Sequence, residues 1–292
     1  MNLASVNLAR VNLARVRRGT GTTGALARRA SRGAPKWLWL LLAVCCVTFP
    51  LRAADPPLSP DAIVQKVLDS DPWGFTGGEV KASVVLTDKR GATRKLSFVA
   101  ASKLHDPPLS KSIVRFSSPP DLAGAGFLQI QRRNGDDDRF LFLPALKRSR
   151  RISGNLRGSS FMGTDFSFAD VDRRDLRDSQ SKQLGMAKIG SHPCYVVDII
   201  PRRGDSQYSH LEMWVRTDNF LPLRSRMYDK ADVLIKTFEA QEVKRVSGQW
   251  FLSKSLMTDH KHDHTTLLVL ESIIVNANIP DEEFSVRALE KP

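Results

Sequence analysis

Apolar and polar residues alternate with a period of two along most of the chain from about residue 79 onward. Every second residue from Val80 to Leu86 is apolar, which is the pattern of a strand with one buried face. Segments of this kind follow at residues 93–102, 112–117, 126–132, 139–143, 183–189, 194–200, 209–216, 221–228, 233–243, 250–258 and 265–276. Most links between them have the length of hairpin turns, so sequential strands are expected to pair antiparallel. The pattern predicts one large antiparallel sheet of about eleven strands, and a sheet of that size must curl.

Helical spacing of apolar residues is confined to two places. Ser59 precedes Pro60, which suits an N-cap followed by the first helical position, and apolar residues then recur at helical spacing up to Asp71. A second, shorter helix is expected between residues 165 and 176. We therefore predict a mainly β protein with few helices.

The first 53 residues differ from the rest of the chain. They contain nine basic side chains and no acidic ones, with a cationic region that ends at Lys36 and an apolar core at Trp37–Phe49. These are the parts of a secretory signal peptide, and cleavage is expected after Ala53. The core of thirteen residues is shorter than the ~20 that a membrane-spanning helix needs, although a permanent anchor is the alternative.

We accordingly predict a signal peptide at residues 1–53 and a single exported, periplasmic domain at residues 54–292. The opening repeat MNLAS-VNLAR-VNLAR has no period of a repeat fold, and a misassigned start codon upstream of the true signal explains it as well as any function.

The formal net charge of +13 belongs mostly to the leader. Residues 54–292 hold 35 basic and 31 acidic side chains, which is a net charge of +4. So small an excess does not indicate a nucleic-acid partner. Cys194 is the only cysteine in this part of the chain, so no disulfide within the domain is expected.

Candidate metal ligands gather at His260, His262 and His264. On a continuous strand, alternate residues would place the three imidazoles on one face, which suits zinc or copper. The polar residues around them instead favour a turn between two strands, so no metal site is predicted. The sequence contains no G-x-S-x-G, H-E-x-x-H or glycine-rich nucleotide motif. We predict no catalytic residue, no enzyme activity and no cofactor.

The segment at residues 140–170 combines features that an ordinary hairpin does not need. An apolar strand ends at Pro144, and a basic cluster at residues 147–151 leads into a loop that contains glycines. The loop closes on Phe161 and Met162, two bulky apolar residues beside a flexible, cationic stretch. These two residues either pack beneath the loop as an ordinary cluster or line the mouth of an apolar cavity.

Residues 143–152 read LPALKRSRRI, and residues 159–170 read SSFMGTDFSFAD. This order of basic, small, aromatic and acidic residues resembles the signature of the outer-membrane lipoprotein-sorting family, the LolA-like superfamily of periplasmic lipoprotein and lipid carriers. The resemblance extends from about residue 59 to the C-terminus. It implies a half-barrel of antiparallel strands, with the N-terminal helix packed in its concavity and an apolar interior that holds acyl chains.

Large apolar side chains on the predicted strands are candidates to line such a cleft, although any one of them could equally belong to a solid core. The candidates are Phe116, Phe127, Leu128, Ile130, Phe140, Phe142, Met213, Val215, Leu223, Met227 and Phe238. A second set is expected at the rim of the cleft, namely Arg150, Arg151, Phe161, Met162, Asp165 and Phe166. The two arginines would there meet a phosphate or carboxylate head group.

The leading functional hypothesis is a periplasmic carrier or chaperone that binds the acyl chains of a lipid or lipoprotein. It would take them from an inner-membrane transporter to an outer-membrane acceptor, with only transient membrane contact and no chemical step. The alternative is a lipid-sensing or interaction module of the same fold that partners an inner-membrane transporter or signalling protein. A hydrolase of envelope lipids ranks below both, because one fold hosts several roles but no catalytic motif is found.

Overall fold

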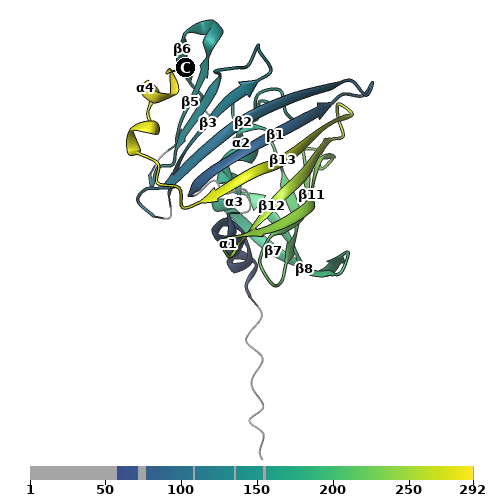
Figure 1. The fold of residues 1–292 in the computed structure, drawn as a ribbon. Helices are drawn as coiled ribbons and strands as arrows, with labels where there is room; N and C mark the ends of the chain where they lie inside the picture. The colour runs from purple at the N-terminus through teal and green to yellow at the C-terminus, as the bar shows by residue number, and fades with distance from the viewer. Residues whose placement is uncertain (1–57, 72–76, 108, 135, 154–155, 292) are drawn as a thin grey trace, which may run out of the picture. The chain divides into compact units, whose positions relative to one another are not determined.

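The computed structural model describes residues 58–291, apart from residues 72–76, 108, 135 and 154–155 (Figure 1). The predicted signal peptide at residues 1–53 lies outside the described residues. Within the described part of the chain, no helix is long and apolar enough to cross a membrane.

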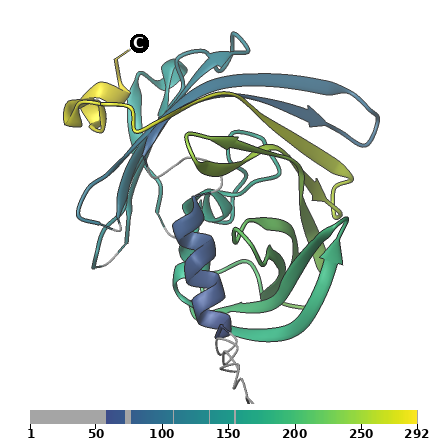
Figure 2. The same cartoon turned by 60° about the horizontal axis from the view of Figure 1, so that its bottom comes forward.

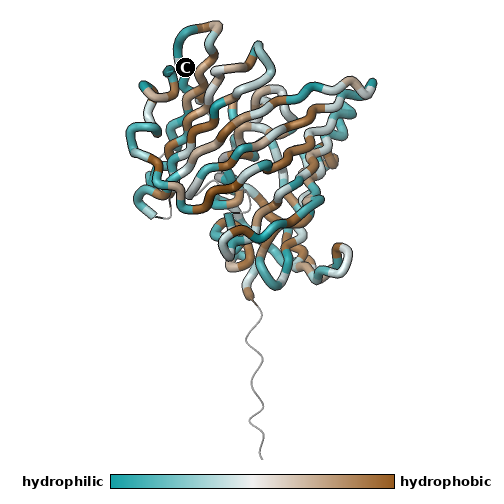
Figure 3. The backbone as a smooth tube through the Cα atoms, in the orientation of Figure 1, coloured by the Kyte–Doolittle hydropathy of each residue, from teal (hydrophilic) through white to brown (hydrophobic). Residues whose placement is uncertain are grey.

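Thirteen antiparallel strands form one unclosed, curled sheet, which confirms the predicted fold class. The strands are β1 (Gly78–Thr87), β2 (Thr93–Leu104), β3 (Ser110–Ser118), β4 (Gly126–Ile130), β5 (Asp138–Leu143), β6 (Arg148–Arg151), β7 (Ser179–Ile189), β8 (His192–Pro201), β9 (His210–Arg216), β10 (Pro222–Tyr228), β11 (Leu234–Val246), β12 (Gln249–Asp259) and β13 (His264–Val275). The alternation of hydrophobic and hydrophilic residues that predicted the strands is visible along the tube in Figure 3. One strand was not expected: β6 lies in the basic cluster, residues 147–151, that precedes the expected loop.

The strand order is β6-β5-β4-β3-β2-β1-β13-β12-β11-β10-β9-β8-β7. Two meanders, β1–β6 and β7–β13, are therefore joined by the pairing of β1 with β13. Because β6 and β7 are the two edges of the sheet, the chain between them must pass from one edge to the other. Residues 152–178 are here called the crossing segment, and its described residues, 152–153 and 156–178, lie within the hollow of the sheet (Figure 2).

Helix α1 (Pro60–Ser70) lies in the same hollow (Figure 2). The Ser59 side chain accepts a hydrogen bond of 3.2 Å from the backbone N–H of Ala62, and the helix ends at Asp71 in the left-handed conformation with φ 43°. The expected N-cap and helix end are thus confirmed. The buried face of α1 packs against side chains of β8–β12 and consists of Ile63, Val64 and Val67.

Two short helices, α2 (Phe168–Asp172) and α3 (Arg174–Arg177), belong to the crossing segment and confirm the short helix expected there. The Ser167 side chain accepts from the backbone N–H of Asp170, and the Asp170 carboxylate accepts from the backbone N–H of Ser167. This reciprocal capping fixes the start of α2. Arg173, with φ 57°, separates the two helices.

The C-terminal residues cover the outer face of β3–β5. They include the 3₁₀ helix η3 (Asp281–Glu283) and α4 (Val286–Leu289), which lie beside these strands in Figure 1. The side chains of Ile279, Phe284 and Leu289 form a cluster with outward-facing residues of the three strands. A further 3₁₀ helix, η1 (Pro144–Leu146), links β5 to β6.

Candidate functional site

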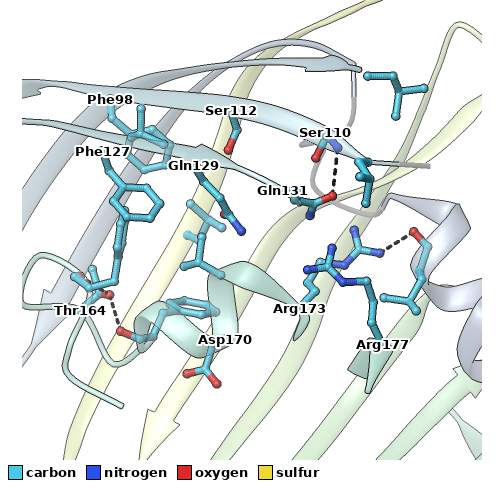
Figure 4. Close-up of a pocket in the computed structure, with 18 of the residues that line it drawn as sticks. Phe98, Ser110, Ser112, Phe127, Gln129, Gln131, Thr164, Asp170, Arg173 and Arg177 are labelled. Atoms are coloured by element: carbon cyan, nitrogen blue, oxygen red, sulfur yellow. Dashed lines mark hydrogen bonds between the residues drawn. The ribbon is translucent and has the colours of Figure 1, made fainter. Parts of the chain in front are cut away.

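A cavity of about 500 Å³ lies between the inner face of β1–β4 and the crossing segment (Figure 4). The C-terminal half of α1 borders it on one side, through Gln65, Leu68 and Asp69. A volume of roughly 300–1,000 Å³ is usual for sites that bind small molecules. This cavity is therefore the first candidate for a ligand-binding site.

One end of the cavity is closed by aromatic rings. Phe161 of the crossing segment inserts among rings of the sheet, with centroid distances of 6.2 Å to Phe116 and 5.3 Å to Phe127. Phe98 extends the cluster, 5.5 Å from Phe116. These distances are those of favourable aromatic pairs, so the rings form a fixed apolar wall.

The other end is polar, and the change occurs along β3 and β4. The inward-facing residues of β4 pass from Phe127 to Gln129, and Gln131 continues the series beyond the strand. On β3 they pass from Phe116 to Ser112, which lies directly opposite Gln129 in the ladder. Since alternate residues share one face of a strand, the sequence itself sets this gradient from aromatic to polar.

The polar end reaches solvent. Gln65 and Asp69 of α1 are exposed, as are Leu104 at the end of β2 and Pro107 of the β2–β3 link, and all four line the cavity. By contrast, the phenylalanines at the other end are buried. The mouth of the cavity therefore lies between α1 and the β2–β3 link.

Two arginines of the crossing segment line the polar end. Arg173 donates to the backbone carbonyls of Val67 and Leu68, at 3.2 and 2.5 Å, and so ties the crossing segment to the end of α1. Burial lowers the pKa of Arg173; the carboxylate of Asp71 opposes this effect, and the nearby charge of Arg177 adds to it. The guanidinium of Arg173 is held by helix carbonyls, which carry the negative end of the helix dipole and favour a cation there.

Arg177 lies nearer to solvent, with a side chain that is 29% exposed, and donates to the Asp137 carboxylate at 3.2 Å. Asp137 is buried and also accepts from Gln129 Nε2 at 3.4 Å and from Arg139 at 3.3 Å. The hydrogen bonds from these donors offset the free-energy cost of removing the Asp137 carboxylate from water.

Two buried carboxylates anchor the crossing segment to the sheet. Asp165 accepts hydrogen bonds from the Thr266 hydroxyl at 2.7 Å and is 2.8 Å from His264 Nδ1. Asp170 accepts from the Tyr208 hydroxyl at 2.8 Å and from Lys236 Nζ at 3.3 Å. Burial, together with the charge of Asp170, raises the pKa of Tyr208 well above its ordinary value, so this hydroxyl remains a donor.

The structure divides the residues expected to line a cleft into three groups and leaves Leu223 outside them. Phe116 and Phe127 line the cavity. A second group packs against α1 in a separate core and consists of Met213, Val215, Met227 and Phe238. Leu223 is buried outside the three main clusters.

The third group faces away from the cavity, against the C-terminal residues, and consists of Leu128, Ile130, Phe140 and Phe142. This differs from the expectation that they line the cleft. The reason lies in the strand period: Leu128 follows the inward-facing Phe127, so its side chain must point to the opposite face. Where consecutive residues are all apolar, as at Phe127 and Leu128, the sequence does not show which of them faces the cavity.

The expected rim residues are likewise separated. Phe161 and Phe166 line the cavity, but Phe161 lies at its closed end. Met162 is half-buried against the neighbouring core, and Asp165 is a buried anchor. The two remaining residues, Arg150 and Arg151, are exposed on β6 and do not line the cavity.

Sequence reasoning missed the polar residues of the cavity, namely Ser112, Gln129, Gln131, Arg173 and Arg177. Gln129 and Gln131 alternate with Leu128 and Ile130, and hydrophobicity alone predicts that the apolar pair faces inward. A sheet covered on both faces has no single apolar side, so the period of two shows which residues share a face but not which face is inner.

The three clustered histidines have three different partners. His260 Nε2 is 2.7 Å from the Thr237 hydroxyl, and His262 Nδ1 is 2.8 Å from Asp259. His264 contacts Asp165, and the turn expected between two strands is present between β12 and β13. Among the residues that the structure describes, no group of three or more His, Cys, Asp or Glu side chains could hold a metal ion.

The chain was compared with protein families, with curated proteins and with solved structures. A family described as "Uncharacterized protein" matches residues 109–291, more than half of the chain. A search of curated proteins found no match.

Three solved structures share the fold. A domain described as an outer membrane lipoprotein-sorting protein, from Vibrio parahaemolyticus, is 24% identical with a TM-score of 0.74, over 80% of this chain and 98% of that one. A DUF1329 family protein from Desulfovibrio piger is 25% identical with a TM-score of 0.74, over 80% and 100% of the two chains. A LolA superfamily protein from Nitrosomonas europaea is 19% identical with a TM-score of 0.63, over 78% and 98%. The chain therefore belongs to the family matched at residues 109–291, and its half-barrel with enclosed helices is the fold of these three structures, which include a LolA superfamily protein.

Proposed function

We propose that the protein binds the acyl chains of a lipid or lipoprotein in this cavity and carries them across the periplasm. The observation that carries the proposal is the gradient within the cavity, from a closed aromatic end to a polar end that reaches solvent. An amphiphile fits this arrangement with its tail inward and its head group at the mouth. The likeness to a domain described as an outer membrane lipoprotein-sorting protein supports the same reading.

The binding energy would come from burial of the tail. Each methylene that leaves water contributes about 0.8 kcal/mol, so about ten of them supply roughly 8 kcal/mol before the costs of ordering the ligand. The aromatic rings are already packed against one another, so the protein loses little conformational entropy when the ligand binds.

Entry is expected at the mouth between α1 and the β2–β3 link. Phe161 is 7% exposed and belongs to the closed end, and Asp165 ties the following turn to β13. An acyl chain that passes Leu104 at the mouth can reach the aromatic end without moving this turn. The loop at residues 161–163 thus acts as the floor of the cavity rather than as its gate.

The proposal assigns no chemical step. Transfer would follow from a higher affinity of the next partner for the acyl chain, with an inner-membrane transporter as donor and an outer-membrane protein as acceptor. Export to the periplasm rests on the predicted leader, so the mature protein should begin at Ala54 or Asp55. Protein sequencing that finds Trp37–Phe49 retained in membrane-extracted material would contradict a soluble carrier.

The first test is to identify the ligand that the protein carries when it is purified from its own cells. The protein would be purified from its own envelope without detergent, denatured and extracted, and the extract analysed by lipid mass spectrometry. Acylated molecules in near-stoichiometric amount are expected. Extracts that match those of an unrelated periplasmic protein, prepared in parallel, would contradict the proposal.

A variant that fills the cavity locates the binding site. Val171 of α2 lines the cavity, and Val171→Trp should displace about two methylenes of ligand, which at ~0.8 kcal/mol each lowers affinity roughly tenfold. Met162→Trp is the matched control, because Met162 is half-buried on the same segment but does not line the cavity. Affinity would be measured by titration with a fluorescent alkyl probe. Equal affinities of the two variants would place binding elsewhere.

A further inference from the structure

The polar end of the cavity presents a short strip of hydrogen-bonding groups from β3 and β4. Ser112 and Gln129 are partners in the ladder, and Gln131 lies two residues further along the same face. Figure 4 shows the three side chains extending from the strands into the cavity. Opposite residues of such a pair have Cβ atoms about 4.5–5.5 Å apart and diagonal ones about 7–8 Å apart, a spacing that long side chains such as Gln131 can bridge toward a shared ligand.

The orientation of the Gln129 amide is fixed by its partner. Its Nε2 donates to the carboxylate of buried Asp137 at 3.4 Å, and a carboxylate can only accept. The amide nitrogen must therefore face Asp137, and Oε1 is directed away from it. Gln129 is only 5% exposed, and its Oε1 receives no hydrogen bond from the described residues. Gln129 lines the cavity, so this oxygen is an acceptor open to a ligand there.

The Gln131 amide is fixed in the opposite sense. Its Oε1 accepts from the backbone N–H of Ser110 at 2.9 Å, which leaves Nε2 as the free end of the amide. Within the described chain, neither this Nε2 nor the Ser112 hydroxyl has a hydrogen-bond partner. The strip therefore offers one acceptor, from Gln129, and two donors, from Gln131 and Ser112.

We propose that this strip recognises a secondary amide at the base of the alkyl chain, so that the preferred ligand is an N-acylated amphiphile. The amide N–H donates to Gln129 Oε1, and the amide carbonyl accepts from Gln131 Nε2 and the Ser112 hydroxyl. This inference rests on the proposed function, because it assumes that the alkyl chain occupies the aromatic end.

An ester in the same place is a poorer match. It has two acceptor oxygens and no N–H, so it cannot donate to Gln129 Oε1, and a water molecule would have to supply the donor that the amide provides directly. A free anion is also a poorer match, because the nearby guanidinium groups are already engaged: Arg173 with carbonyls of α1, and Arg177 with Asp137. The neutral amide satisfies the groups that are left.

The test uses two uncharged probes that differ in one group, N-methyldecanamide and methyl decanoate. On the wild-type protein the amide should bind about fivefold more tightly, the worth of one net hydrogen bond. Gln129→Met should remove this preference by weakening only the amide. Ser112→Ala should weaken both probes alike, because both carry the carbonyl that Ser112 serves. The ratio of the two affinities is measured on one folded sample, so it is independent of any loss of stability from Gln129→Met.

The outcomes separate the two claims. If neither probe binds, the proposed function fails. If both bind with equal affinity, or if the preference survives Gln129→Met, the amide subsite is wrong while the acyl-binding site stands. Tighter binding of decanoate than of the amide would likewise overturn the subsite, in favour of an anion site. An N-decanoyl dipeptide and N-decanoylethanolamine then distinguish a lipoprotein from a lipid as the source of the amide, and preference for either over its ester counterpart supports the proposal.

Discussion

The two halves of the hollow in this sheet are filled in different ways. Beneath β8–β12, helix α1 inserts the apolar side chains of Ile63, Val64 and Val67, and the space is a solid core. Beneath β1–β4, the crossing segment supplies only two short helices, α2 and α3, of five and four residues. Its phenylalanines close one end of this half, and the rest remains a cavity of about 500 Å³.

The difference shows that a residue's position in the sheet does not by itself determine whether its side chain belongs to the packed core or lines the cavity. Met213 of β9 and Phe127 of β4 are both inward-facing and buried, yet only Phe127 borders the cavity. What covers each strand makes the distinction: a long amphipathic helix in one half and an anchored, mostly irregular segment in the other. Substitutions in the two halves should therefore have different consequences.

The largest expected effect comes from a matched pair of leucines. Leu252 is fully buried in the core beneath α1, and Leu252→Ala should lose about 4–5 kcal/mol of unfolding free energy, because it leaves a closed void. Leu268 borders the cavity, and Leu268→Ala should lose only about 2–3 kcal/mol, because it enlarges an existing space. Denaturant unfolding measures both values.

Affinity for an alkyl probe should show the reverse order. Leu268→Ala should change the affinity of the folded protein, and Leu252→Ala should leave it unaltered. Equal losses of stability together with equal affinities would remove the distinction between the two halves.

The next effect concerns the anchors that keep the crossing segment in place. Asp165→Ala leaves the fully buried Thr266 hydroxyl without its carboxylate and should cost about 1–3 kcal/mol. Asp165→Asn is the control, since it keeps one acceptor oxygen and should cost less. Hydrogen exchange should speed up in residues 161–171 of Asp165→Ala and remain slow in α1. Uniform acceleration across both halves would show that the segment has no separate anchoring.

The smallest effect lies on the outer face of the solid half, and it depends on pH. His210 stacks on Tyr228 with ring centroids 4.4 Å apart and bridges Asp198 and Asp232 at 2.7 and 2.9 Å. Burial alone would lower the pKa of His210, but the hydrogen bonds to the two carboxylates outweigh it and raise the pKa above the ordinary 6.5.

Because the folded pKa is the higher one, this stabilisation is fully present below about pH 6.5 and is lost as pH rises through the folded pKa. His210→Gln should therefore lower stability by up to about 1 kcal/mol near pH 5.5 and by less near pH 8.5. Thermal unfolding at the two pH values measures the difference. A larger loss at the higher pH would reverse the assigned sign, and a change in alkyl affinity would contradict the separation of the two halves.

The sequence predicted the sheet more fully than the site. The period of two marked almost every strand, and Ser59-Pro60 marked the start of α1, because backbone geometry and capping act locally. The pairing of β1 with β13 and the cover of β3–β5 by the C-terminal residues are long-range contacts with no local signal. Phe127 and Leu128 are an example. They are adjacent in the sequence, but Phe127 lines the cavity and Leu128 packs against the C-terminal residues, and only the tertiary structure distinguishes these two environments.

The charged groups of the site show the same limit. Arg150 and Arg151 precede a glycine-containing loop in the sequence, and this position suggested contact with a ligand head group. In the structure they belong to β6, an edge strand of the sheet, and are exposed. Arg173 and Arg177 lie beside the cavity instead, because the crossing segment must return through the hollow from β6 to β7. Only the strand order reveals that path.

The central claim is that an alkyl chain occupies the half of the hollow beneath β1–β4. The most direct test is crystallography of the protein with an alkyl chain that carries bromine on its terminal carbon. The anomalous signal of bromine should lie at the closed end, among the rings of Phe98, Phe116, Phe127 and Phe161. A bromine peak beneath α1, on the outer face or at the mouth, with the rings of the closed end unoccupied, would contradict the account.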